Sequence, residues 1–207
     1  MIPEKDKLHL HAGRYEALGD AIFAVAMTLL VLELHIPHTS GNSWHDFSVS
    51  FREVWTSFLC YFISFAVLGI MWFGHRMVFE YIGKLNKYFI FLGIPFYMMV
   101  CIVPFSTRFL AANTLRSFGI AIYGLNLSLC NLALYAQWTY GIKRPSLMIK
   151  ELPDEVKKEA RISFLISPVL YSVAIITGFF YPVISIIIYV ITPLLYLIPS
   201  KLDKYLP

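Results

Sequence analysis

The chain has 207 residues, of which 58% are apolar and 14% are charged. A water-soluble domain of this length has too little polar surface to cover so many apolar side chains, so the composition excludes a soluble globular protein and indicates one integral membrane domain over residues 1–207. The formal net charge is only +4, and it gives no reason to expect a nucleic-acid partner. Cys60, Cys101 and Cys130 lie in apolar segments without CxxC spacing, so we expect free thiols.

Long apolar runs predict six membrane-crossing helices. A crossing helix needs about 20 mostly apolar residues, and charged or polar breaks separate most of the runs, with Tyr181-Pro182 as a tight turn between the last two. The expected spans cover residues 17–36, 52–74, 88–110, 117–140, 161–180 and 182–199. The predicted fold class is therefore all-α, with lipid as the solvent of the bundle.

The distribution of basic residues favours one orientation of this bundle. Six crossings place both termini on one side, and 14 of the 17 Lys and Arg residues fall on that side. The three on the other side are Arg52, Arg108 and Arg116. Because cytoplasmic segments of membrane proteins are enriched in Lys and Arg, we expect a multi-pass protein of the cell membrane with both termini in the cytoplasm.

The first apolar segment carries two stripes of side chains. At 100° per residue, one stripe consists of branched apolar side chains centred on Val25, and the stripe beside it consists of small residues that let helix backbones approach closely. The apolar stripe contains Leu18, Ile22, Val25, Leu29, Leu32 and Ile36, and the small stripe contains Ala17, Ala21, Ala24 and Thr28. This helix is expected to pack tightly against another surface.

Asp20 is a charged residue in the first half of this segment. It lies more than about 120° from Val25 on the helical wheel, and a carboxylate near the membrane costs several kcal/mol unless it has a partner. The topology puts the start of the first helix beside the end of the second, which carries His75. We therefore predict a polar network of Arg14, Asp20 and His75 at the cytoplasmic side. At the opposite end, the same logic predicts a pair between Glu33 and Arg108.

The first segment also resembles a known family signature. Residues 14–34 read Arg-Tyr-Glu-Ala-Leu-Gly-Asp and continue into an apolar run, and this is similar to the first-helix motif R-x-x-x-F-S-D of the transmembrane protein 175 family, which comprises lysosomal potassium channels and their prokaryotic homologues. Later matches follow the family order at Ser64-Phe65, Gly69, Trp72, His75, Pro104-Phe105-Ser106-Thr107, Trp138, Arg161 and Pro168.

The resemblance implies a potassium-selective cation channel rather than an enzyme. One six-helix repeat implies a homotetramer in which the first helix of each subunit lines a central pore. By motif position, Val25, Leu29 and Leu32 are the implied pore constriction, and Thr28 is the implied hydroxyl layer linked to selectivity. Potassium is then the permeant ion, and no cofactor and no bound metal are expected.

Two departures from the family pattern occur in the motif. Leu18-Gly19 stands where the family has Phe-Ser, and Ala21 replaces the usual glycine. Gly19 therefore lacks a hydroxyl that the family contributes to the inner polar network. Val25 is smaller than the usual isoleucine or leucine, which predicts a looser constriction.

The expected mechanism is a hydrophobic gate. An ion that sheds water at a ring of branched side chains meets a barrier, and such rings gate by dewetting. The sequence contains no TVGYG motif, which excludes a carbonyl-lined filter of that type, and no helix has arginine at every third position, as a voltage sensor would.

Two other function classes stay open at this point. A proton-coupled secondary transporter could use Asp20 and His75 as a relay, although transporter folds usually contain internal repeats. A membrane metalloenzyme could use His35, His38 and His45, but no HExxH or GxSxG motif accompanies them.

Overall fold

The computed structural model describes residues 10–34, 44–149 and 153–196, and its dominant elements are six α-helices, as predicted. Five helices are long and apolar enough to cross a membrane, and the sixth is shorter. Their bounds are α1 Ala12–Leu32, α2 Trp44–Tyr81, α3 Lys87–Ala112, α4 Ser117–Ile142, α5 Asp154–Gly178 and α6 Pro182–Leu195. The chain is a multi-pass, all-α membrane protein.

The helix ends differ from the predicted spans for a physical reason. Apolarity marks only the part of a helix that lies in lipid, whereas the helical backbone continues into the headgroups or water wherever no residue breaks it. α2 shows the largest difference, since it has 38 residues where residues 52–74 were expected. α6 has 14 described residues, and the predicted end of its span, residues 197–199, lies outside the described part of the chain.

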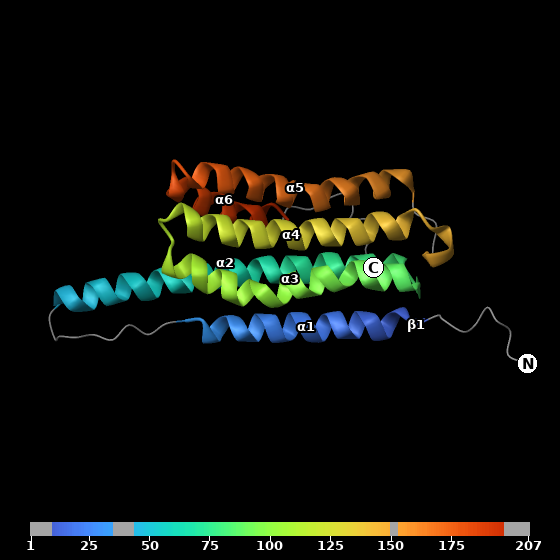
Figure 1. Cartoon of the computed structure of the whole chain (residues 1–207), viewed down its shortest axis with the longest axis horizontal. Helices are drawn as coiled ribbons and strands as arrows, with labels where there is room; N and C mark the ends of the chain where they lie inside the picture. The colour runs from blue at the N-terminus through green and yellow to red at the C-terminus, as the bar shows by residue number, and fades with distance from the viewer. Residues whose placement is uncertain (1–9, 35–43, 150–152, 197–207) are drawn as a thin grey trace, which may run out of the picture.

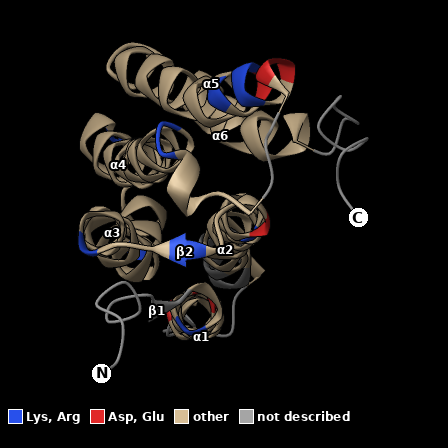
Figure 2. Ribbon diagram, turned by 90° about the vertical axis from the view of Figure 1, so that its right-hand side faces the viewer, with Lys and Arg blue, Asp and Glu red and all other residues tan. Residues whose placement is uncertain are grey.

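The helices are arranged in successive layers, with α1 at one edge. α1 lies against α2 and α3, and α4 and α6 lie between these two helices and α5 (Figure 2). Most helices run the length of the bundle, whereas the first part of α2 projects beyond the other helices (Figure 1). α1 is therefore a helix with neighbours on one side only.

Short strands mark one end of the bundle. β1 Leu10–His11 pairs antiparallel with β2 Lys84–Leu85, and an isolated bridge joins Ile82 to Met148 beside the 3₁₀ helix η2 Pro145–Leu147. We call this end, where α1, α3 and α5 begin and α2 and α4 finish, the β1–β2 end. Hydropathy alone did not predict these pairings, because two-residue strands carry no periodicity.

A buried polar network holds the middle layers together. The Ser64 hydroxyl lies 2.9 Å from the Tyr123 hydroxyl and 2.7 Å from the Thr107 hydroxyl, and all three residues are buried. Buried hydroxyls are costly unless they are hydrogen-bonded. The network therefore fixes how α2, α3 and α4 sit against one another.

Replacing Tyr123 by Phe should lower stability measurably. The variant deprives Ser64 of its Tyr123 partner inside the bundle, which costs about 1 kcal/mol and should lower the thermal unfolding midpoint in detergent. Tyr88→Phe is the matched control, because Tyr88 is 70% exposed. Equal midpoints for both variants would contradict the structural role of the network.

Candidate ion pathway along α1

α1 is buried along one face only. The face that packs on α2 and α3 consists of Tyr15, Gly19, Phe23, Ala26 and Leu30, which recur every three or four residues. All other faces of this apolar helix are left for lipid, a second subunit or a pore.

The predicted constriction residues lie on the uncovered side. Val25 is 56% exposed, Leu29 is 40% exposed and Leu32 is 72% exposed. None of them belongs to the core of the subunit, so three large apolar side chains line up on the open face of the helix. This is the position a pore-lining stripe requires, although a lipid-facing stripe would be equally exposed.

The small-residue stripe is also uncovered. Ala17, Ala21, Ala24 and Thr28 are all exposed, so no helix of the same subunit uses the close approach that they allow. The Thr28 hydroxyl donates a hydrogen bond of 2.8 Å to the carbonyl of Val25. That bond leaves the oxygen lone pairs of Thr28 directed away from the helix backbone, where they can meet a polar group or an ion.

Asp20 has a partner that sequence reasoning missed. Its carboxylate accepts a 2.8 Å hydrogen bond from the indole N–H of Trp72 on α2. The Arg76 guanidinium lies 5.9 Å from the centroid of the same indole ring, and Glu16 interacts electrostatically with both Asp20 and Arg76. The two acidic groups at this end of α1, Glu16 and Asp20, therefore face α2.

His75 is fully buried and makes a hydrogen bond of its own, although Asp20 also interacts with it electrostatically. Its Nε2 lies 2.9 Å from the Tyr97 hydroxyl, which in turn donates to the carbonyl of Tyr15 at 3.2 Å. The imidazole tautomer decides which of Nε2 and the Tyr97 hydroxyl is the donor. His75 thus joins α2 to α3 and to the first turn of α1, and it packs on the Phe23 and Phe96 rings.

The predicted network of Arg14, Asp20 and His75 is therefore not joined as one hydrogen-bonded cluster. Asp20 bonds to Trp72 and His75 bonds to Tyr97. Arg14 is exposed and lies about 20° from Val25 on the helical wheel, which points it along the open stripe and away from both. Trp72 was among the family matches, but nothing in the sequence pointed to Tyr97, because a tyrosine in an apolar span has no distinctive spacing.

Gly19 allows α1 to pack closely against the buried His75 and Tyr97 side chains. A β-carbon at this position would meet the His75 ring and would lie 2.8 Å from the Tyr97 hydroxyl. The imidazole and the phenol therefore occupy the space that a side chain at position 19 would need. The departure from the family motif is therefore matched by the packing of α1 on α2 and α3.

The Glu33 and Arg108 pair is confirmed at the other end of α1. A guanidinium nitrogen of Arg108 lies 3.5 Å from a carboxylate oxygen of Glu33. The pair joins the last turn of α1 to α3, so α1 is tied to its own subunit at both ends. His35 and His38 lie outside the described residues, and no group of three potential metal ligands occurs within the described part.

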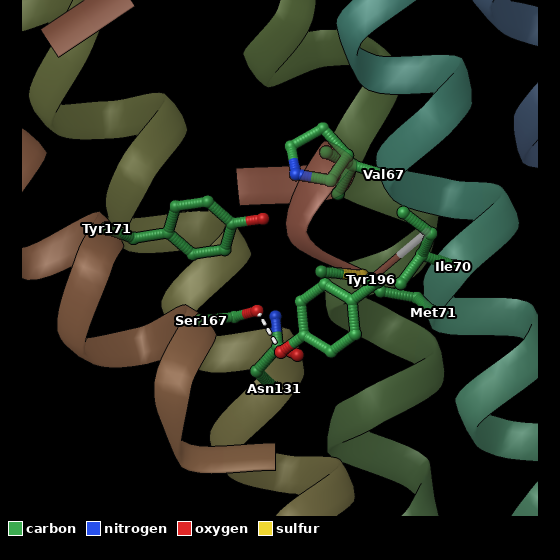
Figure 3. A pocket seen from close by; sticks show the side chains of 8 residues that line it. Val67, Ile70, Met71, Asn131, Ser167, Tyr171 and Tyr196 are labelled. Atoms are coloured by element: carbon green, nitrogen blue, oxygen red, sulfur yellow. Dashed lines mark hydrogen bonds between the residues drawn. The ribbon is translucent and has the colours of Figure 1, made fainter. Parts of the chain in front are cut away.

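A cavity lies away from α1, among α2, α4, α5 and α6 (Figure 3). Its polar wall includes Asn131, Tyr171 and the pair of Ser167 and Tyr196, whose hydroxyls are 2.6 Å apart. The cavity has room for about one water molecule.

Adding a side chain at Gly19 should loosen α1. Gly19→Ala places a methyl group against the His75 ring, and overpacking of this kind costs about 1–3 kcal/mol, so the thermal midpoint in detergent should drop. Gly13→Ala is the control, because a β-carbon there meets nothing within 4 Å. Equal stability of both variants would show that α1 does not approach His75 this closely.

The comparisons with known proteins agree with this architecture. The family model described as endosomal/lysosomal potassium channel TMEM175 matches residues 14–104. A potassium channel of Chryseobacterium sp. is 30% identical over 192 residues, which cover 91% of this chain and 94% of the relative. A potassium channel of Streptomyces collinus is 30% identical over 170 residues, which cover 79% and 81%.

A solved structure extends the likeness to three dimensions. The crystal structure of a lysosomal potassium-selective channel TMEM175 homologue from Chamaesiphon minutus superposes with a TM-score of 0.77 at 25% identity, over 92% of this chain and 98% of that chain. The match includes α1, its packing partners and the outer layers. The chain belongs to the TMEM175 family of ion channels.

Proposed function

We propose that four copies of this chain form a potassium-selective channel of the cell membrane, with α1 of each copy around the central axis. One observation carries the proposal: α1 leaves its apolar stripe and its small-residue stripe uncovered. A helix that only faced lipid would not need a row of alanines. Small residues at helical spacing instead favour close contact between helices.

The two stripes fit different roles in such an assembly. The alanines of the small stripe, Ala17, Ala21 and Ala24, would approach the neighbouring subunit, and the adjacent stripe together with Thr28 would then face the axis. Closed rotational symmetry repeats each contact around the ring. Four is the number that the family resemblance implies for a single six-helix repeat.

Val25, Leu29 and Leu32 would form the narrowest part of the pore. Rings of branched side chains expel water, and an ion can pass only when the ring admits enough water to keep it solvated. Potassium loses its hydration more cheaply than sodium, so this constriction favours potassium. Thr28 is 3 residues from Val25 and 1 residue from Leu29, and its hydroxyl would offer an oxygen at the same level.

The names of the relatives support the choice of ion. The two similar chains from Chryseobacterium and Streptomyces are named potassium channels, and the superposed channel is described as potassium-selective. The excess of basic residues on one side favours an orientation with the β1–β2 end and both termini in the cytoplasm. Asp20 and Trp72 would then hold the cytoplasmic end of α1 against α2.

A polar substitution in the constriction should increase ion flux. Leu29→Asn would allow water to enter the ring, and a barrier lower by about 1.4 kcal/mol gives about tenfold more potassium flux in reconstituted vesicles. Leu129→Asn on α4 is the matched control, because Leu129 is 41% exposed and Leu29 is 40% exposed. Absence of potassium flux from the wild type would refute the channel itself.

A bulky residue in the small stripe should disrupt assembly. Ala24→Leu inserts three carbon atoms where the backbones of two α1 helices would approach, which costs about 1–3 kcal/mol at each repeated contact. The tetramer should then give way to smaller species in light scattering of the detergent-solubilised protein. Ala136→Leu on α4 is the control, because Ala136 is also exposed. An intact Ala24→Leu tetramer would place the subunit contact elsewhere.

A further inference from the structure

A group of four exposed basic side chains lies at the β1–β2 end of the bundle. Lys84 and Lys87 come from the connection between α2 and α3, and Lys143 and Arg144 follow α4 (Figure 2). Nothing in the proposed ion pathway uses them. We call these four residues the basic cluster.

The backbone segments that carry the cluster are bonded to each other. The Asn86 side chain donates to the Tyr140 hydroxyl at 3.1 Å and also accepts from the backbone N–H of Phe89 at 2.9 Å. The guanidinium of Arg144 lies 3.9 Å from the centroid of the Tyr140 ring. This stacking orients Arg144 beside the Asn86 side chain that joins the end of α4 to the start of α3.

The positive charge of the cluster is not balanced by neighbouring acids. Among the described residues, no carboxylate lies within ion-pair distance of any of the four. Asp154 pairs with Lys157 at 2.9 Å, and Glu80 interacts with Glu16 on the α1 side of the bundle. Within the described part of the chain, the charge of these four side chains is therefore not neutralised by an ion pair.

The cluster continues into an apolar row along α3. Lys87 is the first residue of α3, and its ammonium lies 5.6 Å from the centroid of the Phe91 ring. Phe91, Ile94 and Met98 are 56%, 42% and 56% exposed, and with Lys87 they occupy one face at i, i+4, i+7 and i+11. A charged end above an apolar row matches a molecule with an anionic head and a hydrocarbon tail.

We propose that the basic cluster binds the headgroup of an anionic phospholipid, with an acyl chain along the exposed face of α3. Lys87 and Lys143 stand at the ends of membrane spans, which is the level of the headgroup phosphates. Arg144 offers a planar pair of donors to phosphate oxygens, and the lysines add point charges. The site is independent of ion conduction, so it can be tested whether or not the channel opens.

The test measures lipid retention by the full-length purified chain. Native mass spectrometry with phosphatidylglycerol and, separately, phosphatidylcholine should show preferential retention of phosphatidylglycerol by the wild type. Each Lys or Arg near an anionic surface is worth about a fivefold change in affinity. The double variant Lys87→Gln/Arg144→Gln should therefore bind phosphatidylglycerol about 25-fold more weakly.

A charge-matched variant distinguishes a specific lipid-binding site from general electrostatic attraction between the protein and anionic lipid. Lys158→Gln/Arg161→Gln removes the same charge from exposed positions on α5 at the same end of the bundle, and it should retain the wild-type affinity. An equal loss of affinity in both double variants would overturn the site, because it would mean that only the total charge matters. Equal retention of the two lipids by the wild type would overturn it as well.

Discussion

The contact of α1 with α2 and α3 at Gly19 constrains everything else in this subunit. A helix in lipid satisfies its own backbone and gains little from burying apolar surface against another helix, so close packing and polar contacts decide where it sits. The His75 ring and the Tyr97 hydroxyl fill the space beside Gly19, and Trp72 bonds to Asp20 one residue later. Together they fix the rotation of α1 about its axis.

That rotation determines which side chains remain on the outside. With Tyr15, Gly19 and Phe23 turned inward, Val25 and Leu29 are turned outward. The polar contacts are at one end of the helix, and the open apolar stripe runs toward the other, where Glu33 meets Arg108. The anchoring of α1 within the subunit and its proposed role around the axis thus use opposite faces, so neither limits the other.

Sequence reasoning reached the six helices and both stripes because hydropathy and helical period are local properties. It also reached the Glu33 and Arg108 pair, since topology alone puts the end of the first helix beside the end of the third. It did not find that His75 bonds to Tyr97, because that contact depends on how three helices rotate against one another. It also did not find the pairing of β1 with β2. For the same reason, the sequence showed at Gly19 only a missing hydroxyl and not the His75 ring that packs beside it.

The length of α2 has a mechanical consequence. At 38 residues it is about 57 Å long, nearly twice the hydrocarbon thickness of a bilayer, and no loop interrupts it between its projecting start and Trp72. A continuous helix is a rigid element over this distance. The projecting start of α2 and Trp72, which donates to the Asp20 carboxylate, therefore belong to one uninterrupted helix.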